Sequence, residues 1–313
     1  MPSALKGLKV LDFSTLLPGP FATLYLADMG AEVIHVESPT RPDLIRLFTP
    51  YAHGQATAHL YLNRNKQSVA LDLKDPENIA AIKAKICEYD IVVEQFRPGV
   101  MQRLGLDYAT LAEINPRLIY CSITGYGQTG DYKDKAGHDI NYLALSGIAG
   151  HSGRQQSGPP PLGIQVADIA GGSLHAVIGI LTAVIERAQS GQGQYIDISM
   201  TDCVVALNSM AAAAALAGNI TPQPESGILN GASFYDYYET QDGRYLSIGS
   251  LEPQFMSGLA TLLELPLLLE KGASLHAEDR LAVRQAIQQK IKTRSLDAWQ
   301  QLFSAQDVCV EPV

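Results

Sequence analysis

The chain has 313 residues, of which 46% are hydrophobic and 18% are charged, and its formal net charge is −9. This length suits two domains with buried cores, and the acidic balance is opposite to the basic surface typical of nucleic-acid binders. The four cysteines form no paired motif, so we expect reduced thiols rather than disulfides or a zinc site. The sequence shows no secretory signal and no membrane-spanning run, which predicts a cytoplasmic protein without membrane or nucleic-acid partners.

The first part of the chain predicts strands that alternate with helices. Residues 8–13 form a short apolar run, LLPGP follows as a loop, and residues 21–29 suit a helix. Strands are then expected at 32–37, 68–73, 91–94 and 118–124, with a helix at 75–89. This alternation predicts an α/β fold with a mostly parallel sheet.

The second part predicts two long helices and then a change of composition. Residues 168–189 and the alanine-rich residues 201–216 suit helices on either side of a short strand at 195–198. A stretch rich in glycine and proline follows, and then a tyrosine-rich hairpin whose turn signal is Asp242-Gly243. We therefore place a large domain at 1–217, a linker at 218–227 and a small α+β domain at 228–313.

The segment AGHDINYLALSG contains the first candidate catalytic group, His138. A glycine precedes the His-Asp pair and a helix is expected after it, so His138 falls at a helix N-terminus. The positive end of the helix dipole there favours the neutral imidazole that a general base requires. The alternative is that Asp139 is an ordinary helix N-cap and His138 is an incidental surface residue.

The segment PPLGIQVADIAGGS contains the second candidate, Asp168, between an apolar run and a helix. Gly171 and Gly172 in the first turn of that helix are expected to let a ligand approach the backbone. A structural role for Asp168 as a helix cap is equally consistent with the local sequence. Burial would raise the pKa of the carboxyl group and the helix dipole would lower it.

A third group of candidates consists of four cations at loop positions next to predicted strands, where α/β folds bind their ligands. They are Arg64, Lys66, Lys74 and Arg97. Arginine and lysine at such positions suit phosphate groups, although each is also compatible with a solvated surface. Glu252, before Pro253, is an expected loop carboxylate with no role that its own segment reveals.

Taken together, these segments resemble the family III CoA-transferase (CaiB/BaiF) superfamily, and within it the α-methylacyl-CoA racemase branch. The resemblance runs over nearly the whole chain, from GLKVLDFSTLLPGPFATLYLADMGAEVIHVE through LNRNKQSVALDLK and EQFRPGVMQRLGLDY to GASFYDYYETQDGRYLSIGSLEPQF. The opening motifs are common to the superfamily, whereas GHDINY and LEPQF resemble the racemase branch.

The resemblance implies a Rossmann-like large domain, a smaller domain, and a homodimer whose two chains interlock as rings. It implies that His138 and Asp168 exchange protons on opposite faces of the substrate α-carbon. It places Asp139 in the segment whose backbone N–H holds the thioester oxygen, and Glu252 as the carboxylate that orients the histidine. The implied CoA-contacting residues are Arg64, Asn65, Lys66, Leu71, Leu73, Lys74, Arg97, Gly137, Ile140, Asn141 and Tyr142.

The implied reaction is racemisation of a 2-methylacyl-CoA through an enolate, which needs neither a metal nor a redox cofactor. The main alternative is CoA transfer, in which an aspartate at the position of Asp168 attacks the acyl-CoA and forms a mixed anhydride. Such a transferase does not need His138 or Glu252, and it tends to carry a glycine-rich loop near LEPQF, which this sequence lacks. A third possibility is an acyl-CoA-binding protein without activity. The presence of His138, Asp168 and Glu252 argues against it.

Family members usually continue beyond the segment that resembles CVEPV, with a portion that returns from the small domain to the large one. That return segment is expected to be missing here, which bears on ring closure in the dimer. The sequence leaves open which 2-methylacyl group the chain uses.

Overall fold

The computed structural model describes residues 3–313 and divides the chain into two units, which we describe separately. Unit 1 extends up to Ile148 and resumes from Pro161 to Ser209, and unit 2 contains Ala149–Pro160 and Met210–Val313. The sequence-based boundaries differ from this division, because they placed residues 149–160 and 210–217 in the larger domain. The contacts of Arg154, described below, give the physical reason for the first of these differences.

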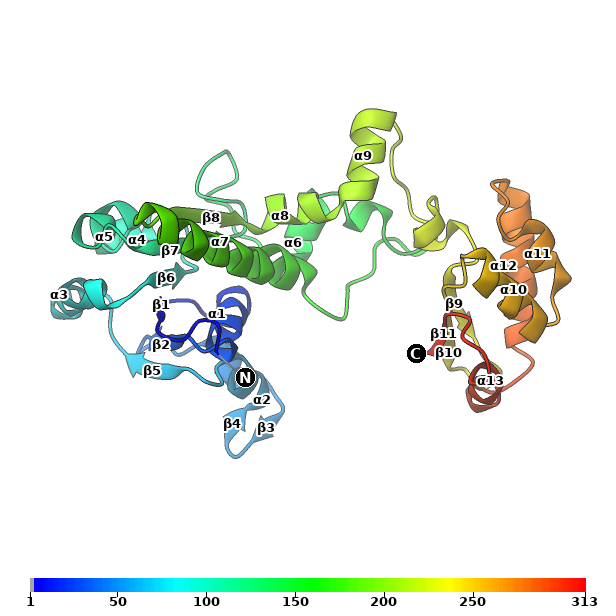
Figure 1. Ribbon diagram of the computed structural model, residues 1–313, viewed down its shortest axis with the longest axis horizontal. Coiled ribbons are helices and arrows are strands. Elements are labelled where there is room, and N and C mark those ends of the chain that lie inside the picture. The colour runs from blue at the N-terminus through cyan, green and yellow to red at the C-terminus, as the bar shows by residue number, and fades with distance from the viewer. Residues whose placement is uncertain (1–2) are drawn as a thin grey trace. The chain divides into compact units, whose positions relative to one another are not determined.

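Unit 1 is built on a six-stranded sheet in which every pair of neighbours is parallel. Across the sheet the strands are β5 (Gln67–Ala70), β2 (Glu32–Glu37), β1 (Lys9–Asp12), β6 (Ile91–Glu94), β7 (Ile119–Thr124) and β8 (Tyr195–Ser199) (Figure 1). Numbered along the chain, this order is 3-2-1-4-5-6, so the sheet grows in opposite directions from β1 and β6. Loops diverge at such a switch point and leave a crevice where ligands bind. The predicted α/β fold with a parallel sheet is confirmed.

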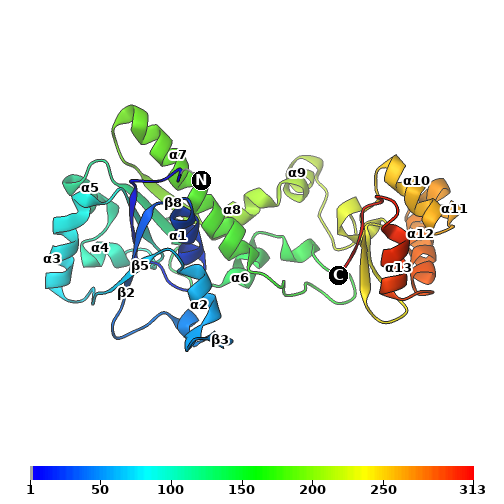
Figure 2. The same cartoon turned by 60° about the horizontal axis from the view of Figure 1, so that its bottom comes forward.

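Helices cover both faces of this sheet, as the turned view in Figure 2 shows. One core lies beneath α1 (Pro18–Asp28), η4 (Ala167–Leu174) and α7 (His175–Ser190). The other lies beneath α3 (Pro76–Lys85), α4 (Val100–Leu104) and α5 (Tyr108–Ile114). Strand β6 shows the division, because Ile91 and Val93 belong to the first core and Val92 to the second. A strand covered on both faces reads as a continuous apolar run, which is why its bounds were predicted correctly.

Two predicted helices have different ends from those expected. Helix α1 begins at Pro18, inside the LLPGP segment that was expected to be a loop, because proline fits the first turn of a helix, where its missing N–H is not needed. The expected helix 201–216 is broken at Asn208 into α8 (Met200–Leu207) and α9 (Ser209–Gly218).

The expected helix at 168–189 is present and combines η4, a π-helical segment, with α7. Among the described residues, this stretch, Ala167–Ser190, is the single unbroken helix long and apolar enough to cross a membrane by length and composition. Its buried side chains, including Ala176 and Ile180, belong to the core over the sheet. That packing is typical of a core helix in an α/β domain.

The remaining elements of unit 1 are short. They are η1 (Leu44–Leu47), β3 (Tyr51–Ala52), β4 (Gln55–Ala56), α2 (Thr57–Leu62), η2 (Ile86–Glu88) and α6 (Asp139–Leu145).

Unit 2 combines a three-stranded antiparallel sheet with four helices around Trp299. Besides α9, which lies in unit 2 from Met210 on, its elements are η3 (Ala149–His151), η5 (Ile228–Ala232), β9 (Asp236–Glu239), β10 (Tyr245–Ile248), α10 (Pro253–Leu262), α11 (Pro266–Lys271), α12 (Ala277–Ile291), α13 (Leu296–Phe303) and β11 (Val310–Pro312). The predicted hairpin is confirmed, with Gly243 at a φ of 77° in its turn. Strand β11 pairs with β10 and was not anticipated from the sequence.

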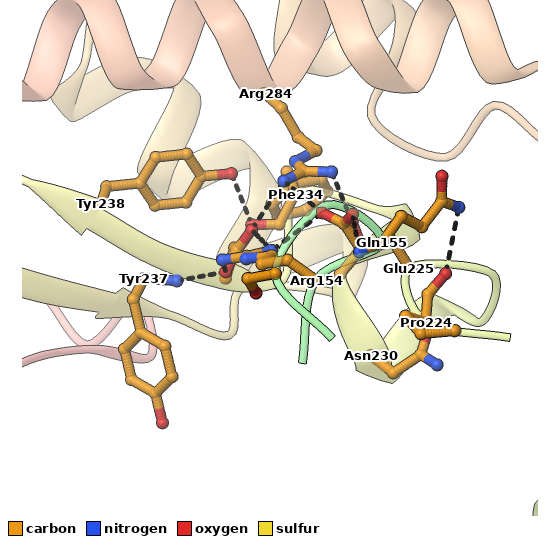
Figure 3. A network of polar contacts seen from close by, with 12 residues as sticks. Arg154, Gln155, Pro224, Glu225, Asn230, Phe234, Tyr237, Tyr238 and Arg284 are labelled. Carbon is orange, nitrogen blue, oxygen red and sulfur yellow. Dashed lines mark hydrogen bonds and ion pairs between the residues drawn. The ribbon is translucent and has the colours of Figure 1, made fainter. Parts of the chain in front are cut away.

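A cluster of four charged side chains holds residues 149–160 in unit 2, and we call it the Arg154 clamp (Figure 3). The Arg154 guanidinium contacts both carboxylate oxygens of Asp236, at 2.8 and 2.5 Å, and Glu225 at 3.2 Å. Arg284 of α12 reaches the same Asp236 at 3.0 Å and donates to the Gly231 carbonyl at 2.6 Å. A planar guanidinium facing a carboxylate through two bonds is the strong form of such a contact. The segment therefore leaves unit 1 and is fixed in unit 2.

A second polar cluster lies at the end of β1, where the Asp12 side chain is completely buried. Asp12 accepts hydrogen bonds from the Ser14 backbone N–H at 2.9 Å and the Thr23 hydroxyl at 2.5 Å. The Lys66 ammonium lies 3.5 Å from Asp12 Oδ2, and His35 Nδ1 lies 3.3 Å from the same oxygen. Burial alone raises the pKa of Asp12, but the Lys66 and His35 charges and the hydrogen bonds outweigh it and hold that pKa well below its usual range. The cluster therefore contains an ionised carboxylate inside the fold.

Replacement of Lys66 by methionine is expected to lower the free energy of unfolding by about 3–5 kcal/mol, because the Asp12 carboxylate stays buried without its cation. Urea denaturation of Lys66→Met measures this difference. Lys9→Met is the matched control, since Lys9 forms an exposed ion pair with Glu32, worth roughly 0–1 kcal/mol. An equal loss in both variants would contradict the expectation.

The Arg154 clamp gives a second expectation. Asp236→Asn removes the charge that Arg154 and Arg284 share, so amide hydrogens in residues 149–160 are expected to exchange faster with deuterated solvent. Asp242→Asn is the control, because Asp242 pairs with Arg244 elsewhere in unit 2 and does not contact that segment. Unchanged exchange in residues 149–160 of Asp236→Asn would rule out the clamp as their anchor.

Candidate functional site

His138 occupies the N-cap position of α6. Its backbone is extended, with φ −130° and ψ 172°, and its N–H donates to Asn141 Oδ1 at 3.0 Å. The imidazole is exposed. The cap position therefore belongs to the histidine, and the alternative in which Asp139 caps this helix is wrong. A side chain at this position lies at the start of the helix and is open to solvent and ligands.

The Asp139 side chain instead reaches the start of η4. Its Oδ1 accepts the Ala167 backbone N–H at 2.6 Å and the Asp168 backbone N–H at 3.1 Å. These donors lie at the N-terminus of η4, where backbone N–H groups lack partners within the helix. The two candidate segments, more than twenty residues apart in sequence, are therefore joined through one carboxylate.

Asp168 lies in the first turn of η4 and is half-buried. Burial, with a further contribution from the negative charge of Asp139, raises the pKa of Asp168 to about 6. The raised pKa agrees with the effect of burial that was considered from the sequence. A carboxyl group with this pKa is well placed both to accept and to donate a proton near neutral pH.

Gly171 and Gly172 serve packing within unit 1. A β-carbon at Gly171 would lie 2.8 Å from Val204 Cγ2 and 2.9 Å from the Met200 carbonyl oxygen. A β-carbon at Gly172 would lie 3.1 Å from the Met200 side chain and from Pro18 Cβ. The expectation that these glycines admit a ligand is wrong, because protein atoms of α1 and α8 already occupy the space.

Tyr142 fixes the loop that precedes α6. The tyrosine is buried, and its hydroxyl donates to the Gly137 carbonyl at 2.6 Å. A β-carbon at Gly137 would lie 2.6 Å from the Tyr142 ring, so this loop needs glycine there. Tyr126, which sequence reasoning missed, packs edge-on against the Tyr142 ring with centroids 5.2 Å apart. Of the other expected contacts in this segment, Ile140 and Asn141 are exposed.

The expected CoA-binding residues between Arg64 and Leu73 differ from one another in their surroundings. Arg64 and Asn65 both bind Asp28 of α1, at 2.5 and 2.9 Å. Lys66 is only 1% exposed and also donates to the Pro20 carbonyl, so it is an internal counterion and not an open phosphate ligand. Leu71 and Leu73 pack half-buried against the second core.

Lys74 and Arg97 are exposed and follow the ends of β5 and β6. Within residues 3–313, neither side chain pairs with a carboxylate. These two cations remain open to an anionic ligand at the edge of the sheet where its loops diverge.

Glu252 lies in unit 2, exposed, as the residue before α10. Its predicted role toward His138 connects the two units and stays a prediction. In the described part of the chain, no group of three or more His, Cys, Asp or Glu side chains is arranged to hold a metal ion.

Sequence reasoning also missed Glu94, the last residue of β6. Burial raises the pKa of Glu94 to about 7, although hydrogen bonds from Ser122 and the Phe96 N–H oppose the change. Glu94 lines a cavity of about 270 Å³ together with Tyr120 and Tyr195. Tyr120 belongs to the core beneath α3, α4 and α5, so this cavity lies on the sheet face away from η4. The sequence signal for Glu94 is its position as the charged residue that ends the apolar run IVVE.

Comparisons of the sequence and of the structure with known proteins point to one family. A family model described as CoA-transferase family III matches residues 5–313. The chain is 38% identical to α-methylacyl-CoA racemase of Mus musculus, over 99% of this chain and 77% of the relative. It is 35% identical to succinyl-CoA:glutarate CoA-transferase of Homo sapiens, over 99% of this chain and 71% of the relative. A CaiB/BaiF family crystal structure from Brucella suis superposes with a TM-score of 0.85 at 32% identity, covering 100% of this chain and 84% of that one.

The surroundings of Asp168 predict a pH-dependent stability difference. Because its folded-state pKa is raised to about 6, the folded chain binds this proton more tightly than the unfolded chain does. Asp168→Asn removes the ionised form that burial disfavours, so the variant is expected to be the more stable chain at pH 8. That advantage shrinks as the pH falls below 6. Denaturation at pH 8 and pH 5 measures it, with the exposed Asp131→Asn as control. A variant less stable than the parent at pH 8 would contradict this account.

Proposed function

The chain belongs to CoA-transferase family III, and from that premise we propose that it racemises the α-carbon of 2-methylacyl-CoA thioesters. The observation that carries the proposal is the connection between the two candidate bases. His138 begins α6 with an exposed imidazole, and the neighbouring Asp139 binds the backbone of Asp168, whose pKa is raised to about 6.

These groups suit proton exchange at carbon. The α-proton of a thioester is weakly acidic, so its removal needs a stabilised enolate oxygen. The backbone N–H of Asp139, in the first turn of α6, is the proposed donor, and one such donor contributes about 2.7–4 kcal/mol. His138 takes the α-proton of one enantiomer, and protonated Asp168 returns a proton to the opposite face. The reverse direction exchanges their roles.

We propose that the CoA moiety binds at the crevice formed by the diverging loops of a Rossmann-like domain. Arg64, Lys74 and Arg97 are the proposed phosphate ligands, and the loop Gly137 to Tyr142 the proposed wall beside the thioester. Lys66 acts indirectly, because its buried ammonium orders the loop that carries Arg64 and Asn65. Leu71 and Leu73 are proposed apolar contacts.

The proposed assembly is a cytoplasmic homodimer in which Glu252 orients the catalytic histidine. An apolar helix without a covering layer supports the dimer: no residue of α9 is buried, and Met210 and Leu216 are 76% and 88% exposed. Apolar patches of this kind mark protein interaction sites. Proton transfer between His138, Asp168 and carbon requires no metal and no redox cofactor.

CoA transfer is the second candidate, and similarity to succinyl-CoA:glutarate CoA-transferase favours it. Asp168 would then attack the acyl-CoA as a nucleophile. That reaction gives no role to His138, which favours racemisation.

The deciding experiment is incubation of the purified chain with one enantiomer of a 2-methylacyl-CoA in deuterated water. Deuterium is expected at C2, with loss of optical purity, as measured by mass spectrometry and chiral chromatography. Exchange of CoA with a free carboxylic acid, without deuterium at C2, would instead establish the transferase.

His138→Ala is expected to lower racemisation about 10²–10⁴-fold, because one of the two proton-transferring groups is lost. His53→Ala removes another exposed histidine of unit 1 and is expected to keep the parent rate. If His138→Ala still exchanges both enantiomers at full rate, the two-base assignment is wrong.

A further inference from the structure

The Asp139 carboxylate makes an unusual connection for a residue at the start of a helix. Its own helix, α6, is capped at His138, and its Oδ1 bonds two N–H groups of a different helix, η4. One of them belongs to the fully buried Ala167 and the other to Asp168 itself. Those N–H groups precede the first complete turn of η4, where a negative charge is favourable. Asp139 therefore caps η4 from outside.

Asp139 also sets the electrostatic surroundings of Asp168. It is the charged side chain that acts on Asp168 most directly, and it disfavours a second negative charge there. From the same helix, Tyr142 faces the pair, and burial, Asp168 and Asp139 raise its pKa to about 12, so it is neutral. The helices packed on η4 present uncharged atoms of Met200, Val204 and Pro18 to it, including the Pro18 carbonyl that accepts from the Ser173 hydroxyl.

We propose that the Asp139 side chain is a positioning residue, which holds the first turn of η4 against α6 so that Asp168 keeps its place relative to His138. The inference rests on the proposed racemisation and adds to it, because the backbone N–H of Asp139 and its carboxylate then have separate duties. The carboxylate exchanges no proton with the substrate. Its charge keeps a proton on Asp168 at a higher pH than the helix terminus alone would allow.

Two substitutions separate the hydrogen bonds from the charge. Asp139→Asn retains an oxygen that accepts the Ala167 and Asp168 N–H groups but removes the charge. Its kcat is expected to stay within about fivefold of the parent, with KM little changed. The limb of the pH–rate profile that reports Asp168 is expected to move to lower pH, because the repulsion that favours its protonated form is gone.

Asp139→Ala removes both the acceptor and the charge. Its kcat is expected to fall about 10- to 100-fold, more than KM changes, because a misplaced catalytic group slows the chemical step. Amide hydrogens of residues 167 and 168 are expected to exchange faster. Asp75→Ala is the matched control: Asp75 caps α3 through the Glu77 N–H in the same unit, and its loss is expected to leave the pH profile unchanged.

The outcomes are distinguishable. If the parent chain incorporates no deuterium at C2, the proposed racemisation fails, while amide exchange at residues 167 and 168 still tests the positioning role. Parent-like exchange there in Asp139→Ala overturns that role. A pH profile of Asp139→Asn that coincides with the parent profile overturns the charge effect. If Asp139→Ala does not fold, Asp139→Asn carries both measurements: exchange at residues 167 and 168 that is faster than in Asp75→Ala supports the role, because a neutral amide oxygen accepts these N–H groups less strongly than a carboxylate, and equal exchange overturns it.

Discussion

The buried Asp12 carboxylate at the end of β1 requires a cation, and this requirement organises the loops at that end of the sheet. Asp12 ends β1 with no exposed surface, and an ionised group there is stable only when opposite charge and hydrogen bonds surround it. The chain supplies these from four separate segments: the turn after β1, α1, β2 and the loop before β5. Their shared contact at one carboxylate fixes where α1 begins and where the Arg64 loop lies. A different residue at Lys66 would disturb all of them together.

The same principle operates on a smaller scale around Asp168. Asp139 satisfies N–H groups that a helix start leaves without partners, and it simultaneously places a negative charge beside a half-buried acid. The hydrogen bonds join the two helices, and the same negative charge adds to the effect of burial in raising the pKa of Asp168. A neutral cap such as serine would provide the first property without the second.

Local pattern was enough to predict much of the fold, and it failed where contacts between distant segments decide. Strands β2 and β6 have the predicted bounds because their apolar, β-branched runs need no other information. The sequence also brought out His138 and Asp168, each next to a helix start. Lys66 was expected to bind a ligand, since nothing near it in sequence reveals that Asp12 lies within reach. Gly171 and Gly172 were misjudged for the same reason: the atoms that pack against them come from α8, about thirty residues later, and from Pro18 of α1, far earlier in the chain.

The path of residues 149–160 has a consequence for how the chain acquires its structure during synthesis. Arg154 is made long before Asp236 and Arg284, the partners that hold it in unit 2. The Arg154 guanidinium therefore has neither of its carboxylate partners until Glu225, 71 residues later, and Asp236, 82 residues later, have been synthesised. Vectorial folding can complete the sheet of unit 1 early, because β8 ends at Ser199. The clamp, in contrast, closes among the last contacts, so nascent chains pass through a stage in which this loop is accessible to proteases and chaperones.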